Sequence, residues 1–241
     1  MKKKAMIILG VFLFSIGAVV AVVLRIHALS RYFLIDGDSA VFGLMAKHIY
    51  QLQEFPAYLW LNHYAGALVS YIGALFFAMF GISSLSYSLT GLVLSCGWVS
   101  ASIAIVRKIL DLPGAIAAVG FVFVPPSCVL FYSLYPGGVQ AETLLFASII
   151  LFLLLGYNMQ DKKARFSSCF CLGFLSGCGL WLSPGIFPAL LTVLTVFMLK
   201  DKKVFLSNKI VMFAAGLLIG HLPAIVHNIY YPGATFFRLG G

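Results

Sequence analysis

The chain has 241 residues, of which 62% are hydrophobic and only 10% are charged. A soluble domain carries about 25% charged residues, so this composition excludes an ordinary soluble protein and indicates a membrane protein with several spans. The net charge of +9 would suit nucleic-acid binding, but the basic residues stand in short clusters between apolar runs. That distribution is typical of membrane topology, and we expect no nucleic-acid partner.

A basic start, residues 2–4, is followed by an uninterrupted apolar run over residues 5–24. About 20 apolar residues are enough to cross the hydrocarbon core. A cleaved signal peptide is the alternative, but the run is longer than a signal h-region and no A-x-A site follows it. We therefore expect a membrane anchor, followed by an external segment over residues 25–86.

Asp36-Gly37-Asp38-Ser39 opens the most informative stretch of that segment. It precedes a run to Gln53 in which apolar residues recur at i, i+3, i+4 and i+7, which predicts a juxtamembrane helix at the membrane surface. Asp38 stands directly before this run, where an Asp side chain can cap a helix and where the helix dipole favours a negative charge. Two interpretations of Asp38 stay open, a capping residue or an ionised functional carboxylate.

Seven further apolar runs cover residues 64–80, 85–106, 113–132, 143–157, 166–182, 185–199 and 210–229. Twelve of the 16 Lys and Arg residues form four clusters, at 2–4, 107–108, 162–165 and 200–209. The positive-inside rule places all four on the cytoplasmic face, which requires that one run before residue 107 does not cross. The run 64–80 would be only about 26 Å long as a helix, against a core of about 30 Å. We expect it to be a re-entrant or interfacial helix on the outer face; a short tilted span is the alternative.

The predicted fold is therefore an all-α, polytopic membrane protein. It has about seven transmembrane helices, an external juxtamembrane helix and a re-entrant or interfacial helix, with a cytoplasmic N-terminus. Pro125-Pro126 should break or kink its span. The outer face receives Asp36, Asp38 and Glu54, the loop 135–142, the loop 183–185, and the end of the last run.

Glu142 stands at the start of an apolar run, after a Pro-Gly-Gly turn. An acidic residue at the mouth of a span is costly and is a functional candidate. The alternative is a helix-end charge that favours the dipole. His221 and His227 are six residues apart and do not share a helical face, so they do not predict a metal site. The five cysteines lie in or beside apolar runs without metal-ligand spacing, which indicates packing residues.

Several motifs together resemble the N-terminal half of the GT-C membrane glycosyltransferases. The likeness is closest to bacterial relatives of the protein O-mannosyltransferases and of the lipid A aminoarabinose transferase, and it covers nearly the whole chain. It is carried by the run from Asp36 to Ile49, Glu54-Phe55-Pro56, Tyr64-x-Gly66, Tyr71, Phe80-Gly81-Ile82-Ser83, Gly137-Gly138-x-x-Ala141-Glu142-Thr143, and Gly220-x-x-Pro223 with Asn228.

The resemblance implies roles for two acidic residues. Enzymes of this family carry an Asp-Glu pair at the start of a juxtamembrane helix, and its Asp falls on Asp38; a second acidic residue in the second external loop falls on Glu142. Three departures stand against the family pattern. Ser39 replaces the Glu of the pair, and Pro184 stands near the place where some relatives have a Lys. Relatives also usually continue beyond 241 residues, so we expect a truncated N-terminal module that is inactive by itself.

The implied chemistry is transfer of a sugar from a polyprenyl-phosphate donor in the outer leaflet to an unidentified acceptor, in the inner or plasma membrane. Asp38 would take the proton of the acceptor hydroxyl as its oxygen attacks the sugar C1. Candidates for substrate binding are Asp36, Arg31, Lys47, Tyr64 and His221, with Arg238 as a further cationic option. No cofactor is expected, and a divalent metal is left open.

The competing class is a non-enzymatic multi-pass transporter or structural subunit. Transporters usually place ionisable residues near the membrane midplane. In this sequence four of the seven acidic residues fall on the predicted outer face and the spans carry almost none. That distribution favours an interfacial site over a translocation path.

Overall fold

The computed structural model describes residues 2–31, 36–60, 62–157, 162–200 and 207–232. These residues are helical apart from the connecting loops, which confirms the all-α prediction. Within the same ranges there is no strand, only a single antiparallel bridge between Tyr58 and Gly66.

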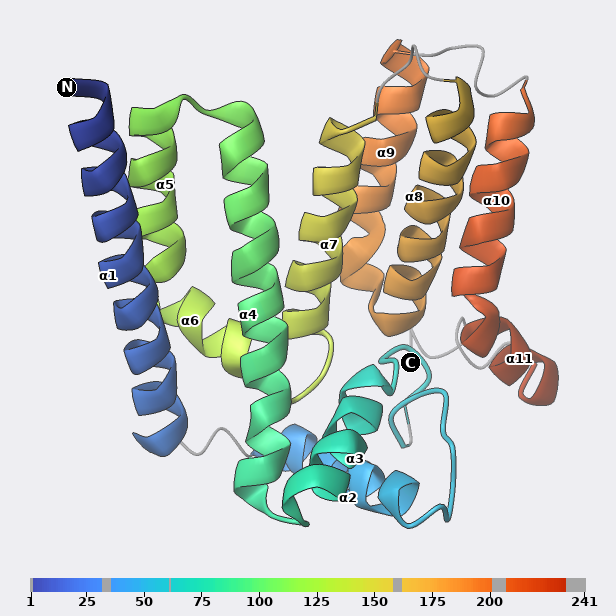
Figure 1. Ribbon diagram of the computed structural model, residues 1–241. Helices are drawn as coiled ribbons and strands as arrows, with labels where there is room; N and C mark the ends of the chain where they lie inside the picture. The colour runs from blue at the N-terminus through green and yellow to red at the C-terminus, as the bar shows by residue number, and fades with distance from the viewer. Residues whose placement is uncertain (1, 32–35, 61, 158–161, 201–206, 233–241) are drawn as a thin grey trace.

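The long helices stand together as a bundle, with a short pair across one end (Figure 1). Helices α1, α4, α5, α7, α8, α9 and α10 run side by side, whereas α2 and α3 lie across what we call the lower end. The N-terminus lies at the opposite, upper end. The bounds are α1 Lys2–Arg31, α2 Gly37–Tyr50, α3 Leu68–Phe80, α4 Ser84–Ile109, α5 Leu112–Phe123, α6 Ser127–Leu134, α7 Gln140–Leu155, α8 Lys162–Leu182, a 3₁₀ turn Pro184–Ile186, α9 Phe187–Lys200, α10 Asn208–Gly220 and α11 Leu222–Tyr230.

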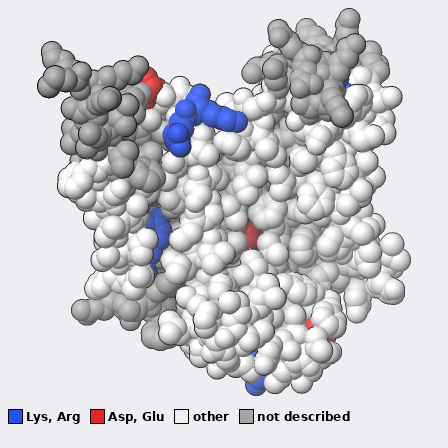
Figure 2. Space-filling view, in the orientation of Figure 1, with Lys and Arg blue, Asp and Glu red and all other residues white. Residues whose placement is uncertain are grey.

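One described helix, α4 with its 26 residues, is long and apolar enough to cross a membrane by itself. Helices α10 and α11 pass the same test only as a pair, with a bend of 58° between them. Pro223 in the first turn of α11 accounts for this break, because proline has no N–H to continue the helical ladder. The face in Figure 2 carries few charged side chains between its two ends. Length and composition thus give a weak indication of membrane association.

The predicted interfacial helix corresponds to α3, which begins at Leu68 and not at Tyr64. Its 13 residues make a helix of about 20 Å, well short of a hydrocarbon core of about 30 Å. It packs against α2 and against the lower part of α4. This position fits a helix that lies along a membrane surface.

The break predicted at Pro125-Pro126 is present: α5 ends at Phe123, and α6 begins at Ser127 in a different direction (Figure 1). The carbonyls at the end of α5 have no partner within their own helix. At this break the chain turns towards the lower end, so α6 and the loop after it reach α2.

Arg25 supports this break from among the long helices. In the sequence it stands at the start of the predicted external segment; in the structure α1 continues to Arg31 and only 2% of Arg25 is exposed. Its Nη1 donates to the carbonyl oxygen of Phe123 at 3.3 Å, and its Nε donates to Ser95 Oγ at 3.0 Å. The long α1 helix thereby fixes the end of α5 against α4.

Helices α8 and α10 approach each other through glycines. A Cβ atom at any of these positions would meet main-chain carbonyl groups of the facing helix, so only glycine fits. The spacing is small-xxx-small on both helices, which is the close packing typical of membrane helices. The glycines are Gly173 and Gly177 on α8 and Gly216 and Gly220 on α10.

Candidate functional site

Asp36 is the N-cap of α2. The Ser39 amide donates to Asp36 Oδ1 at 3.0 Å, and the Asp36 amide donates to Ser39 Oγ at 2.7 Å, which together form a reciprocal capping box. The helix begins at Gly37, so Asp38 lies in the first turn. Of the two interpretations left open for Asp38, the capping residue is therefore wrong, because Asp36 is the cap.

The Asp36 carboxylate has a second partner from a distant part of the chain. The Tyr135 hydroxyl donates to Asp36 Oδ1 at 2.5 Å. Desolvation raises the pKa of Asp36, but hydrogen bonds from Tyr135 and Ser39 outweigh it and leave the pKa below its usual value. Asp36 is thus an ionised carboxylate whose Oδ1 is already occupied, and it is a poor proton acceptor.

Asp38 is in the opposite situation. Its side chain is exposed, and no hydrogen bond to it is found among the described residues. It stands in the first turn of α2. Of the two carboxylates, Asp38 is the one free to accept a proton from a ligand.

Both carboxylates line a cavity of about 270 Å³, which we call the acidic cavity. Its walls come from the start of α2, from the loop between α2 and α3, from α6 and from the loop before α7. Tyr64, predicted to bind substrate, lines it as well. The first and second predicted external loops therefore meet here. The polar side chains of the lining are Asp36, Asp38, Asn62, Tyr64, Tyr132, Tyr135 and Gln140.

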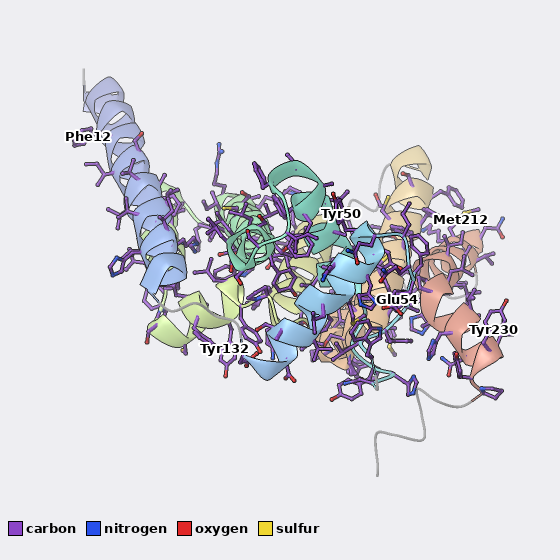
Figure 3. The ribbon with its side chains drawn as sticks, turned by 90° about the horizontal axis from the view of Figure 1, so that it is seen from below. Phe12, Tyr50, Glu54, Tyr132, Met212 and Tyr230 are labelled. Carbon is purple, nitrogen blue, oxygen red and sulfur yellow. The ribbon has the colours of Figure 1, made fainter. Side chains whose placement is uncertain are left out.

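A second and larger space, of about 1040 Å³, lies on the other side of the same loop, and we call it the aromatic groove. Its aromatic side chains come from the loop after α2, from α3, from the end of α8 and from α11: Phe55, Tyr58, Trp60, Tyr71, Trp181, Tyr230 and Tyr231. Leu59 and Asn62 line both spaces, so this loop is their common wall. Figure 3 shows the molecule from below, with Tyr132 of the acidic cavity near the start of α2. Glu54 and Tyr230, which line the aromatic groove, lie beyond the other end of α2.

Hydrogen bonds hold this wall against the end of α8. Trp181 Nε1 donates to the carbonyl oxygen of Ala57 at 2.9 Å, and the Gly66 amide donates to that of Leu182 at 3.0 Å. Gly66 has no room for a side chain, because a Cβ there would meet the main chain of α8. The wall is therefore fixed in place between the two spaces.

Glu142 lines neither space, although Gln140, two residues before it, lines the acidic cavity. It is fully buried in the first turn of α7, and neither carboxyl oxygen has a hydrogen-bond partner among the described residues. Its carboxyl group is close enough to Tyr87 to interact electrostatically with the phenol. The structure therefore does not place Glu142 in the lining that Asp38 shares.

Two other predicted residues, Lys47 and His221, do not line the acidic cavity, and two more lie outside what the structure describes. Lys47 lies in the last turn of α2 and lines neither space. His221 lies at the bend between α10 and α11, also outside both linings, with Nδ1 at 3.3 Å from the carbonyl oxygen of Gly177. Arg31 ends α1, but its side chain lies outside the described residues, as does the whole of Arg238.

The described lining of both spaces contains no Lys or Arg. Within the described chain, no group of three or more His, Cys, Asp or Glu side chains is placed to hold a metal ion. Any positive charge that these linings offer to an anion must therefore come from histidine.

Sequence reasoning missed Tyr135, Asn62 and Gln140 as members of the site. Tyr135 and Gln140 belong to the predicted second external loop, but nothing in the sequence pairs Tyr135 with Asp36. The turn that delivers them has positive φ angles at Gly138 and Val139, of 75° and 62°. The Pro-Gly-Gly motif was the available signal for this turn.

No protein-family model, no curated protein and no solved structure matches this chain.

Proposed function

We propose that this chain is a membrane glycosyltransferase module of the GT-C type, which moves a sugar from a polyprenyl-phosphate donor to an acceptor on the external face. The observation that carries the proposal is the pair of adjoining spaces. A small cavity with two carboxylates shares a wall with a large, mainly apolar groove. A substrate with a polar head and a long apolar chain suits this pairing better than a purely polar one does.

The arrangement of the helix ends supports an external site. The basic helix ends lie at the upper end of the molecule (Figure 1); they carry Lys2–Lys4, Arg107, Lys108 and Lys209. The two spaces lie at the lower end. Basic residues favour the cytoplasmic side, and Trp and Tyr are enriched at membrane surfaces. We therefore propose about seven crossings, formed by α1, α4, α5, α7, α8, α9 and α10 with their short companions α6 and α11. In this proposal α2 and α3 lie on the outer surface.

Asp38 is the proposed general base. Its carboxylate takes the proton of the acceptor hydroxyl while that oxygen forms a bond to the sugar C1, and the polyprenyl phosphate leaves with the electron pair of the broken C–O bond. Asp36 holds the helix start and Tyr135 in place for this step, and Tyr64 and Gln140 offer further polar contacts to the sugar. A buried Glu142 has no access to the reacting atoms, so we assign it no contact with substrate.

The apolar chain of the donor lies in the aromatic groove. At about 1040 Å³ the groove is at the upper end of the range for small-molecule sites, whereas the acidic cavity, at about 270 Å³, has the size of a site for one small polar group. The apolar chain of the donor and its sugar would meet at the common wall, beside Leu59 and Asn62.

The test uses membranes from cells that express the full-length natural protein, supplied with radiolabelled polyprenyl-phosphate sugars. Asp38→Asn removes the base at nearly unchanged size and should lower transfer by about 10²-fold or more. Asp36→Asn is the matched control, since Asn also caps a helix well, and it should cost far less. Near-normal transfer by Asp38→Asn at equal membrane abundance would refute the assignment of the base.

A further inference from the structure

Two histidines from distant parts of the chain meet on the wall of the aromatic groove. His63 Nδ1 lies 2.9 Å from His227 Nε2, although the residues are 164 positions apart. His63 belongs to the common wall between the two spaces, and His227 lies on α11. The rings of Tyr58 and Tyr231 pack against the pair, with centroids 4.9 and 5.0 Å from that of His227.

A pair of this kind can carry a positive charge without losing its internal hydrogen bond. Each imidazole has two ring nitrogens. In the neutral pair one of the two facing nitrogens donates to the other, which leaves one outer nitrogen with a hydrogen and one without. A single added proton goes to the bare outer nitrogen. The pair then has a charge of +1, an intact N–H···N bond and two N–H groups directed outwards. Neither ring has another hydrogen bond among the described residues, so both outer nitrogens are open to a ligand.

The surroundings decide which ligand can use this charge. The titratable groups that face the pair are Tyr58 from the loop and Tyr231 at the end of α11, and Glu54 lines the same groove with Oε1 at 3.1 Å from His48 Nδ1. The rest of the groove is mainly apolar. An anion attached to an apolar chain satisfies both features, because the anion favours the protonated pair and the chain covers the aromatic side chains.

We propose that His63 and His227 form the phosphate-binding point of the aromatic groove, which holds an amphiphile with a phosphate head and an isoprenoid chain. The two outward N–H groups donate to phosphate oxygens, and the chain runs along α11 and Trp181. His63 is next to Asn62, which also lines the acidic cavity, so the phosphate lies at the boundary between the two spaces. The inference rests on the proposed function for the identity of the lipid, but its test needs no sugar transfer.

The experiment measures binding of two radiolabelled probes to the purified chain in lipid nanodiscs. Farnesyl phosphate has the head and the chain, and farnesol has the chain alone. The native protein should prefer farnesyl phosphate. In His63→Gln/His227→Gln, the affinity for farnesyl phosphate should fall by about tenfold or more, the scale of losing hydrogen bonds to a charged group. Farnesol binding should stay the same, which also shows that the groove of the variant is intact.

Matched controls separate the possible sources of an effect. His27→Gln removes an exposed histidine from α1, on the far side of the molecule from α11, and should change neither affinity. Inorganic phosphate alone should compete weakly, because it lacks the chain. The proposal is overturned if the double variant keeps the preference for farnesyl phosphate, if farnesol binding falls equally, or if the native protein binds both probes alike. If the native protein prefers farnesyl phosphate and the double variant loses that preference, but the native protein transfers no sugar, the result counts against the proposed function and not against the binding point.

Discussion

Asp36→Ala tests whether the start of α2 is held as the structure indicates. The substitution removes the acceptor of the Ser39 amide at 3.0 Å and of the Tyr135 hydroxyl at 2.5 Å. Loss of an N-cap costs about 1 kcal/mol. A hydrogen bond to a charged group contributes about 1.5–3 kcal/mol, and the lower end applies because the carboxylate is exposed. With some re-solvation of the freed groups, we expect a loss of about 2 kcal/mol in the free energy of unfolding.

Thermal unfolding of the purified protein in a mild detergent measures this loss. For a chain of this size about 1 kcal/mol corresponds to roughly 2–4 °C in Tm, so Asp36→Ala should lower Tm by roughly 4–8 °C. Asp36→Asn keeps the cap and should lose less than half as much. Asp38→Ala removes no hydrogen bond and should change Tm by less than about 2 °C. A drop for Asp38→Ala equal to that for Asp36→Ala would refute the assignment of the cap.

The same contact predicts a dependence on pH. Because the pKa of Asp36 is lower in the folded protein than in the unfolded chain, the ionised form stabilises the fold. This contribution is fully present above the unfolded pKa, near 4, and is lost as the pH falls through the folded pKa. Tyr135→Phe should reduce the effect, since it removes one of the hydrogen bonds that lower the pKa. An unchanged acid transition in Tyr135→Phe would contradict this account.

Three further predictions concern the packing of the long helices and the topology around α3. Arg25→Met should lower the free energy of unfolding by about 1–3 kcal/mol, measured by thermal unfolding, because a carbonyl at the end of α5 loses its donor away from water. Gly177→Ala should destabilise by about 1–3 kcal/mol through the clash with α10, whereas Gly120→Ala, where a Cβ meets nothing within 4 Å, should be neutral or slightly stabilising. Topology reporters fused after Glu54 and after Ser83 should report the same side of the membrane, since α3 lies between them and is too short to cross.

Local chemistry made the order of the helices and their breaks predictable. Apolar runs, basic clusters and prolines act within a few residues, so the break at Pro125-Pro126 is predicted from residue type alone, whereas the break before Pro223 falls inside the predicted single run 210–229. The charge pattern also brought the loops around Asp38 and Gln140 to one end, where the structure has them lining one cavity. Apolar runs, basic clusters and prolines can all be interpreted without knowing the tertiary contacts.

The features that the sequence did not predict depend on contacts between distant segments. The burial of Arg25 requires the end of α5 beside α1, and the pairing of His63 with His227 requires α11 beside the loop after α2. The periodicity of apolar residues describes one segment at a time, so it predicts neither contact. The capping interpretation of Asp38 placed the start of α2 two residues too late, and the cap is Asp36.

Asp36, and not Asp38, caps α2. In the proposed glycosyltransferase this explains why Ser39 stands where the resembled family has a Glu. In the capping box its hydroxyl accepts the Asp36 amide, and the side chain is fully buried beside Asp36 and α2. A Glu at this position would bring a longer, charged group next to an ionised Asp36, and two adjacent carboxylates raise each other's pKa. Ser39 avoids that repulsion and lets Asp36 stay ionised as the cap. The proposed work of the base then depends on Asp38 alone, which is why Asp38→Asn should remove transfer that Asp36 cannot restore.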